Sequence, residues 1–240
     1  MDLTRKFHKA CADYGLIEDG DHILVGLSGG KDSLALVELL GRRSRIYVPR
    51  FHVTACHVSV ENIGYQSDID YLRSFCEQNH VDFRHEVTRY DERSDAKAQH
   101  NHCFLCSWYR RKALFRVAQE LGCNKIAFGH HRDDIVQTLL MNLIHQGAFS
   151  TMPPKLKLSK MPLTIIRPLC LLDEKDIATY ATEQGYRHVP KLCPYETESS
   201  RSDTKELLSM IERLSPNAKD SIWGAMTNVQ PEYLPRPLIP

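Results

Sequence analysis

Hydrophobic and polar positions alternate along the chain in a pattern that predicts strands and helices in turn. Short apolar runs, several rich in β-branched residues, are typical of buried parallel strands and occur at 22–27, 51–58, 83–87, 125–128 and 163–166. Apolar residues at helical spacing predict helices at 3–14, 34–41, 65–79, 107–121, 173–184 and 203–214, and another ending at His145. Residues 147–160 are expected to form a loop. This alternation predicts an α/β fold with a doubly wound parallel sheet and helical additions at both ends.

Length and composition indicate the domain organisation and the class of protein. The chain has 240 residues, of which 42% are hydrophobic and 25% charged, as in ordinary globular proteins. We expect a single domain with an N-terminal helix in 1–20, a core in 21–170 and a helical extension in 171–240. The net charge of +1 means that an RNA contact requires a local basic face. No apolar run reaches membrane-spanning length and the first residues do not form a signal peptide, so a cytoplasmic protein without membrane contact is expected.

The most informative stretch is Ser28-Gly29-Gly30-Lys31-Asp32-Ser33, between a predicted strand and a predicted helix. Two glycines let the backbone approach an anion, the helix N-terminus offers amide donors, and the serine and lysine side chains add more. The spacing is not that of a Walker A loop. It resembles the PP-loop of ATP pyrophosphatases, which cleave ATP between its α and β phosphates. An ordinary strand-to-helix turn is the alternative, and six matching residues disfavour it.

A second polar stretch, Gly129-His130-His131-Arg132-Asp133-Asp134, follows the fourth predicted strand. Ligands of doubly wound sheets bind beyond the carboxyl ends of the strands, where both stretches would lie. Adjacent carboxylates suit Mg²⁺ bound to ATP, since Mg²⁺ favours one or two carboxylates plus substrate oxygens, whereas helix capping is the alternative role. The expected nucleotide and magnesium contacts are Ser28, Gly29, Gly30, Lys31, Asp32, Ser33, His57, Gly129, Asp133 and Asp134. Of these, Lys31, Asp32 and Asp133 are expected to be catalytic.

The eight cysteines fall into two groups. The first group lies among apolar neighbours and is expected in the core: Cys11, Cys56, Cys76, Cys123 and Cys170. The second group is Cys103-x-x-Cys106 with the distant Cys193, a pattern typical of metal sites. A zinc site would take a fourth ligand, for which His100 and His102 are candidates. Three thiolates would instead leave one iron of a [4Fe–4S] cluster open to a ligand such as sulfide, and the spacing allows both.

Basic residues follow the cysteine pair and the segment Met152-Pro153-Pro154. Each one alone is typical of a solvated surface. Together, beside a nucleotide site and a thiolate site, they favour contacts with RNA phosphates, which position a nucleic-acid substrate. The expected RNA contacts are Arg110, Arg111, Lys155, Lys157 and Arg167.

Over almost its entire length the chain resembles the tRNA 2-thiocytidine synthetases, a family of PP-loop enzymes. The matching stretches are Ile17–Asp21, Leu27–Ser33, Cys103–Ser107 with Arg110-Arg111, Leu121-Gly122, Gly129–Ile135, Met141-Asn142, Met152–Leu156 and Ile166–Leu169. The resemblance implies ATP- and Mg²⁺-dependent thiolation at C2 of a tRNA pyrimidine, namely a cytidine of the anticodon loop. It also implies a [4Fe–4S] cluster held by Cys103, Cys106 and Cys193, a homodimer, and a sulfur donor such as a cysteine desulfurase or sulfide.

Three segments depart from the pattern of this family, and one of them is Trp108-Tyr109-Arg110-Arg111-Lys112, where the family has Arg-Leu-Arg-Arg-Gly. Near the third cluster ligand the family has Pro-Cys-x-x-Cys-Gly, whereas this chain has Pro190-Lys191-Leu192-Cys193-Pro194, and Cys193 is aligned by its preceding leucine. The segment 57–62 also differs. Two alternatives stay open: another PP-loop enzyme, such as a uridine thiolase or a lysidine-synthetase-like ligase, and a zinc-stabilised nucleotide-binding module without turnover. Iron or zinc in the purified protein distinguishes the cluster from the zinc module.

Overall fold

The computed structural model describes residues 3–61, 67–89, 102–187 and 200–235, with the backbone alone at 102–104 and 200–202. The chain forms two compact units. The larger unit comprises residues 1–132 and 153–198, and the smaller one residues 133–152 and 199–240. Cys193 and His100 therefore lie outside the described residues, and the side chains of His102 and Cys103 do as well.

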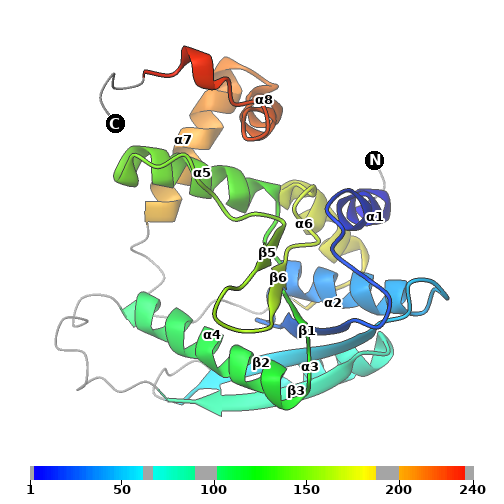
Figure 1. The fold of residues 1–240 in the computed structure, drawn as a ribbon. Coiled ribbons are helices and arrows are strands. Elements are labelled where there is room, and N and C mark those ends of the chain that lie inside the picture. The colour runs from blue at the N-terminus through cyan, green and yellow to red at the C-terminus, as the bar shows by residue number, and fades with distance from the viewer. Residues whose placement is uncertain (1–2, 62–66, 90–101, 188–199, 236–240) are drawn as a thin grey trace. The chain divides into compact units, whose positions relative to one another are not determined.

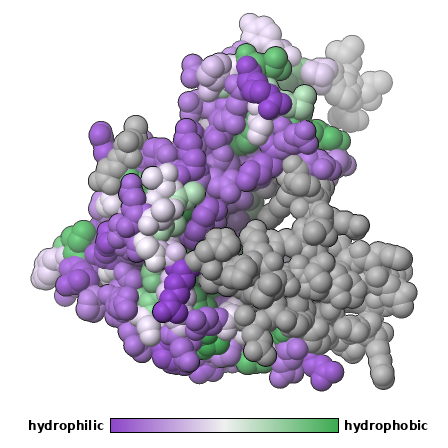
Figure 2. All heavy atoms as spheres, turned by 180° about the vertical axis from the view of Figure 1, so that it is seen from behind, coloured by the Kyte–Doolittle hydropathy of each residue, from purple (hydrophilic) through white to green (hydrophobic). Residues whose placement is uncertain are grey.

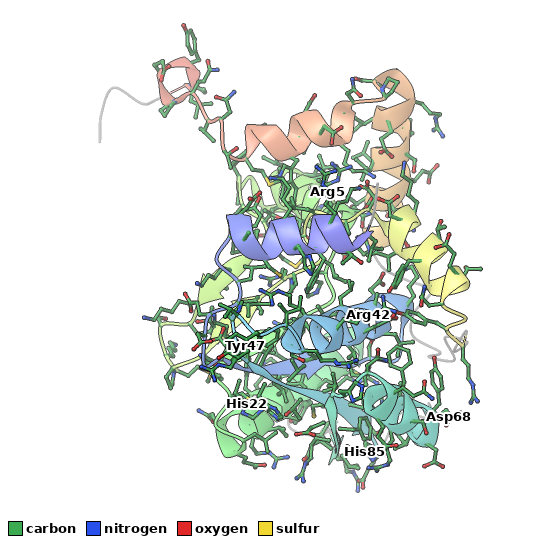
Figure 3. All side chains as sticks on the ribbon, turned by 90° about the vertical axis from the view of Figure 1, so that its right-hand side faces the viewer. Arg5, His22, Arg42, Tyr47, Asp68 and His85 are labelled. Carbon is green, nitrogen blue, oxygen red and sulfur yellow. The ribbon has the colours of Figure 1, made fainter. Side chains whose placement is uncertain are left out.

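The larger unit contains a six-stranded sheet with the strand order β3-β2-β1-β4-β6-β5 (Figure 1). Its strands are β1 (His22–Gly26), β2 (His52–Val60), β3 (Asp82–Thr88), β4 (Lys125–Ala127), β5 (Lys155–Lys157) and β6 (Thr164–Ile166). All neighbouring strands are parallel except β5, which is antiparallel to β6. The order reverses at β1, so the crevice beyond the carboxyl ends of β1 and β4 is the expected ligand position. In Figure 3 His22 marks the amino edge of the sheet, and Asp68 lies on the opposite side.

Helices cover both faces of this sheet. The helices of the larger unit are α1 (Leu3–Asp13), α2 (Lys31–Ser44), α3 (Ile69–Gln78), α4 (His102–Glu120) and α6 (Glu174–Glu183). Ile23 and Val25 of β1 belong to one hydrophobic cluster, together with residues of α1, α2, α3 and α6. Leu24 points to the opposite face and packs in a second cluster with residues of α4. Because successive strand residues point to opposite faces and both faces are covered, the central strand β1 is apolar at consecutive positions, as the sequence predicts.

Several element boundaries differ from the sequence prediction. Helix α2 does not end at Gly41 but continues to Ser44. A Cβ atom at Gly41 would lie 2.3 Å from the Asn79 carbonyl oxygen, so this glycine allows the segment after α3 to approach α2. Helix α4 begins at His102 and not at 107, and therefore contains the cysteine pair. Strand β5 lies in the expected loop 147–160, because its pairing with β6 supplies order that its polar sequence does not predict.

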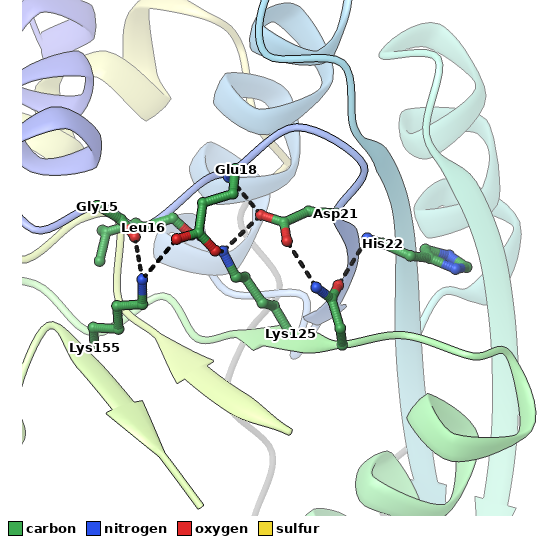
Figure 4. A network of polar contacts seen from close by, with 8 residues as sticks. Gly15, Leu16, Glu18, Asp21, His22, Lys125 and Lys155 are labelled. Atoms are coloured by element: carbon green, nitrogen blue, oxygen red, sulfur yellow. Dashed lines mark hydrogen bonds and ion pairs between the residues drawn. The ribbon is translucent and has the colours of Figure 1, made fainter. Parts of the chain in front are cut away.

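A buried ion-pair network ties the segment before β1 to β4 and β5 (Figure 4). Nζ of Lys125 lies 2.7 Å from Oδ2 of Asp21 and 2.9 Å from Oε2 of Glu18, and donates to the Leu16 carbonyl at 3.1 Å. Lys125 and Asp21 are both buried, so each charge is compensated by the other. Lys155 donates to the Gly15 carbonyl at 2.6 Å and pairs with Glu18 at 3.3 Å. The charged residues Glu18 and Asp21 therefore have a structural role, because they hold the segment before β1 to β4 and β5.

The smaller unit is helical. It contains most of α5 (Arg132–Gln146), together with α7 (Ser200–Leu214), α8 (Ala218–Ala225) and the short helix η1 (Pro231–Tyr233). The sequence prediction includes α5 and α7 but not α8. Within this unit Asn142 donates to the Ser150 carbonyl at 2.8 Å, and the Thr151 hydroxyl donates to the Ile135 carbonyl at 2.5 Å, so the segment after α5 is held to that helix.

The exposed face seen in Figure 2 is mostly hydrophilic, and its hydrophobic residues form small separate groups. Scattered apolar side chains of this kind are normal on a protein surface. Among the described residues, no helix combines the length and the apolar character that a membrane span needs.

Candidate functional site

The turn between β1 and α2 has the geometry of an anion-binding loop. The Ser33 hydroxyl accepts from the Gly29 amide at 3.1 Å and donates to the Gly30 carbonyl at 2.9 Å, closing the turn. The Ser28 hydroxyl lies 3.1 Å from the Ser33 hydroxyl and accepts from the Gly30 amide at 3.3 Å. Gly29 has φ +89°, a left-handed conformation that favours glycine. The amino end of α2, with its partial positive charge, therefore opens onto a turn whose shape is fixed by serine hydroxyls.

Lys31 begins α2 and is held between two carboxylates. Its Nζ atom lies 3.2 Å from Oδ2 of Asp32 and 3.4 Å from Oε1 of Glu174. Partial burial lowers the pKa of Lys31, but these two carboxylates outweigh it, and the net shift is upward. Lys31 is therefore a cation at neutral pH, as a phosphate ligand must be.

The second oxygen of Asp32 differs from the first. Oδ1 of Asp32 is buried and has no hydrogen-bond partner among the described residues. A buried carboxylate oxygen without a partner is costly unless a ligand supplies one. Hard cations such as Mg²⁺ bind carboxylate oxygens of this kind, so Asp32 fits the expected magnesium ligand.

The loop after β4 packs directly on the loop after β1. A Cβ atom at Gly129 would lie 3.1 Å from the carbonyl carbon and oxygen of Asp32 and 3.2 Å from the Ser33 nitrogen. Glycine at 129 is thus required by the close approach of two backbones. The same loop is anchored by Arg132, whose Nε donates to Oδ1 of Asp173 at 2.8 Å and whose amide donates to the Leu172 carbonyl at 2.9 Å. Gly129 and the 28–33 loop are therefore brought together, as predicted.

His57 of β2 also contacts the first loop. Its Nδ1 lies 2.8 Å from the Leu27 carbonyl oxygen, so Nδ1 carries the proton and Nε2 is the basic nitrogen. Burial lowers the pKa of His57 to about 4. His57 is therefore neutral at pH 7, and its hydrogen bond to the Leu27 carbonyl fixes the backbone just before Ser28. Its assignment to nucleotide binding remains a prediction.

Asp133 and Asp134 begin the part of α5 that belongs to the smaller unit. Asp133 is buried and forms an ion pair with Lys219 of α8, and Nζ of Lys219 also lies 3.2 Å from Oε1 of Glu212 on α7. One carboxylate expected to bind magnesium is thus neutralised by a lysine in this structure. The roles of Asp133 and Asp134 in magnesium and nucleotide binding remain predictions.

The cysteine pair lies in the first turns of α4. Positions three apart share one face of a helix, so Cys103 and Cys106 are on the same side of α4. Cys106 is half-buried and packs near the small cluster of Val60 and Leu105. Cysteines 56, 76, 123 and 170 are buried and Cys11 is half-buried, with burial raising the thiol pKa of each, which fits the predicted core role. Together with Cys193, which lies outside the described residues, Cys103 and Cys106 remain the predicted cluster ligands.

The residues expected to contact RNA occupy different environments. Arg110 is half-buried and Arg111 exposed on α4, and Lys157 is exposed on β5. Arg167, directly after β6, is buried. The ammonium group of Lys155 is engaged by Glu18 and the Gly15 carbonyl, as described above, which favours a structural role for this residue.

Two partners of the site are not predicted from the sequence. Glu174 contacts Lys31 and Lys219 contacts Asp133, from 143 and 86 positions away. Neither belongs to a motif, and no local signal identifies them. Asp173 is the N-cap residue of α6, but its carboxylate binds Arg132 and makes no side-chain capping hydrogen bond.

Comparison with known proteins places the chain among PP-loop proteins. The PP-loop domain family matches residues 1–201. A tRNA-cytidine(32) 2-sulfurtransferase of Syntrophotalea carbinolica is 38% identical over 230 residues, covering 94% of this chain and 88% of the relative. Another from Methylobacillus flagellatus is 41% identical over 232 residues, covering 94% of this chain and 75% of the relative.

Solved structures agree with this placement. The U34-tRNA thiolase NcsA from Methanococcus maripaludis, determined with its [4Fe-4S] cluster, matches with a TM-score of 0.78 and 27% identity, covering 97% of this chain and 80% of its own. An NAD+ synthetase from Burkholderia pseudomallei shares the fold alone, with a TM-score of 0.52 and 14% identity over 98% of this chain and 91% of its own. The predicted α/β fold and family are confirmed.

Proposed function

The chain belongs to the PP-loop domain family and, within it, to the tRNA-cytidine(32) 2-sulfurtransferases, and we propose that it is an ATP-dependent enzyme that replaces the C2 oxygen of a tRNA cytidine by sulfur. The observation that carries this proposal is the serine-closed loop at 28–33, with Lys31 at the start of α2, in a chain whose relatives over nearly its whole length are tRNA thiolases. ATP, tRNA and an iron–sulfur cluster follow from the same placement.

The nucleotide loop serves the first half of this reaction. The C2 oxygen of the base attacks the α phosphorus of ATP, pyrophosphate leaves, and the oxygen becomes part of an AMP leaving group. Negative charge builds on the departing pyrophosphate, and the α2 amides, Ser28, Ser33 and Lys31 are placed to stabilise it. Lys31 must exchange its contact with Glu174 for a contact with the phosphate, because the carboxylate and the phosphate are two anions that compete for the same ammonium group.

The cysteines serve the second half. Cys103 and Cys106 lie one helical turn apart, and with Cys193 they are assigned as the three thiolates that a [4Fe–4S] cluster with one open iron requires. When bound, such a cluster presents sulfur for transfer to the activated base.

Further features are part of the proposal. Asp32, Asp133 and Asp134 bind Mg²⁺, which the orphaned Oδ1 of Asp32 supports. Gly129 contributes to the nucleotide site, and the basic residues Arg110, Arg111, Lys157 and Arg167 contact tRNA, whereas Lys155 holds the segment before β1. The sulfur donor is a cysteine desulfurase or sulfide, and the enzyme is a cytoplasmic homodimer.

The test is a thiolation assay on protein purified without oxygen. The protein is incubated with unmodified tRNA, ATP, Mg²⁺ and sulfide, and the nucleosides of the digested tRNA are analysed by mass spectrometry. We expect 2-thiocytidine in the presence of ATP and none with the Lys31→Ala variant. Absence of any thiolated nucleoside with iron-loaded wild-type protein would refute the proposal.

A second candidate is thiolation of a uridine. The structural similarity to the archaeal U34-tRNA thiolase favours it, whereas the higher sequence identity to cytidine enzymes favours the first proposal. The same assay distinguishes the two, because a uridine thiolase yields 2-thiouridine.

A further inference from the structure

Arg167 is a buried cation that no carboxylate of the described residues contacts. It follows β6, with a relative exposure of 7%. Nη1 donates to the Pro153 carbonyl at 2.6 Å, and Nε is buried with no hydrogen-bond partner in the part of the chain that the structure describes. Among the described residues Arg167 forms no ion pair. Lys125, the other buried cation of this unit, is by contrast held by both Asp21 and Glu18.

A second guanidinium lies close to Arg167. Burial, together with the nearby Arg111 cation, lowers the pKa of Arg167 to about 10. On the same turn of α4, Nε of Arg110 is also buried without a hydrogen-bond partner. Burying a charge costs free energy unless a partner compensates it, and a like charge nearby adds to that cost. A bound anion would compensate the buried charge of Arg167, so we expect these guanidinium groups to form an anion-binding site.

The site is separate from the ATP loop. β4 lies between β1 and β6, so the end of β6 is about 10 Å from the end of β1, at ~4.8 Å per strand. Arg167 follows the carboxyl end of β6, on the same edge as the 28–33 loop. The phosphates of ATP in that loop would occupy the cradle of Ser28 and Lys31. An anion at Arg167 would therefore belong to another molecule that enters at this edge.

We propose that Arg167, with Arg111, binds one backbone phosphate of the substrate RNA and thereby fixes the nucleotide that enters the site. This proposal deepens the proposed function and rests on it. The planar guanidinium matches phosphate geometry, and a contact made at a buried group is less screened by salt than one at the surface. Arg167 is thus assigned a different role from the exposed Lys157, which contributes only sequence-independent attraction.

The experiment compares three variants in which a single arginine is replaced by methionine, and one double variant. Arg167→Met and Arg111→Met each remove one cation of the site, while Arg116→Met on the same helix is the control, because Arg116 is already paired with Glu86 and Glu120. We expect the first two to weaken tRNA binding by ~10-fold or more, as for loss of a charge-assisted hydrogen bond, and the control to match wild type. The double variant should bind little worse than Arg167→Met, because both residues share one phosphate. Binding of a non-hydrolysable ATP analogue should be unchanged throughout.

A second measurement tests the anion site without RNA. Inorganic phosphate should raise the melting temperature of the wild-type protein, and this increase should be smaller in Arg167→Met, where the 28–33 loop still binds phosphate but the arginine site does not. Arg167→Lys keeps the charge and replaces Arg167→Met if the latter does not fold. If wild-type protein fails to bind tRNA, the proposed function fails, while the phosphate measurement still tests the site.

Three results would overturn this inference. One is unchanged tRNA and phosphate binding by Arg167→Met. Another is additivity of the two penalties in the double variant, which would show separate contacts. The third is an equal loss of ATP-analogue binding, which would assign the anion to ATP.

Discussion

The ammonium nitrogen of Lys31 lies 3.4 Å from Oε1 of Glu174, although 143 positions separate the two residues. Lys31 begins the helix that follows the phosphate loop, and Glu174 begins α6. The cation expected to bind ATP phosphates is thus in contact with a carboxylate. This relationship leads to opposite predictions for the two residues.

Lys31→Ala should abolish formation of AMP and pyrophosphate, because the loop loses its cation. Glu174→Gln should lower the KM for ATP, by several-fold at most, because both side chains are one-third exposed and their ion pair is weak. Pyrophosphate release measured against ATP concentration checks both. Glu183→Gln, at the other end of α6, is the control. A higher KM in Glu174→Gln would show that Glu174 positions Lys31 productively.

Gly129→Ala should weaken ATP binding and lower stability. Its Cβ would press on the backbone of Asp32 and Ser33 at 3.1–3.2 Å, and overpacking of this kind costs about 1–3 kcal/mol. Thermal unfolding and ATP-analogue titration measure the two effects. Gly224→Ala on α8 is the matched control, since an added Cβ there meets nothing within 4 Å. If Gly129→Ala binds the ATP analogue as tightly as wild type, the loop after β4 is not part of the nucleotide site.

The Asp133–Lys219 ion pair predicts opposite shifts in magnesium dependence. Asp133→Asn should raise the Mg²⁺ concentration needed for AMP formation, because an amide is a poor ligand for a hard cation. Lys219→Met should lower it, because the carboxylate no longer has a competing lysine. A titration of AMP formation with Mg²⁺ checks both variants. Identical curves for wild type and both variants would leave Asp133 with a structural role only.

Replacing any one of Cys103, Cys106 and Cys193 by Ala should remove most of the iron and abolish thiolation, because a cluster with two thiolates is much weaker than one with three. ATP-analogue binding should survive in all three variants. Cys123→Ala is the control, since Cys123 is buried in the α4 face of the core and should cost only packing free energy. Iron content and the absorption spectrum of anaerobically purified protein are the measurements. Full iron in Cys193→Ala would mean that the third ligand lies elsewhere.

His57 predicts a loss of stability in acid. Its pKa is about 4 in the folded protein and about 6.5 when unfolded, so between these values the unfolded chain binds more protons. The stabilising preference for neutral His57 is complete above pH 6.5 and is lost as the pH falls toward 4, by about 3 kcal/mol in total. Denaturant unfolding at pH 7, 5.5 and 4.5 should show this fall in wild type and a smaller one in His57→Gln. Parallel pH profiles for the two proteins would contradict it.

The sequence by itself determined the local features of this protein. The apolar runs identified the parallel strands β1 to β4 and β6, and the glycine and serine pattern located the loop at 28–33, because both signals are carried by neighbouring residues. The cysteines among apolar neighbours were assigned to the core for the same reason. Resemblance to a family supplied the reaction, which periodicity and spacing do not.

Only the tertiary structure decided which distant side chains meet. Glu174 on Lys31, Lys219 on Asp133, and the withdrawal of Lys155 to Glu18 all join residues more than 80 positions apart. Arg167 is equally instructive, because its sequence neighbours do not show that its guanidinium is buried without a carboxylate. Hydrophobic periodicity fixes the face of an element but not the partner that another element brings to it, and that partner sets the charge and burial of each group.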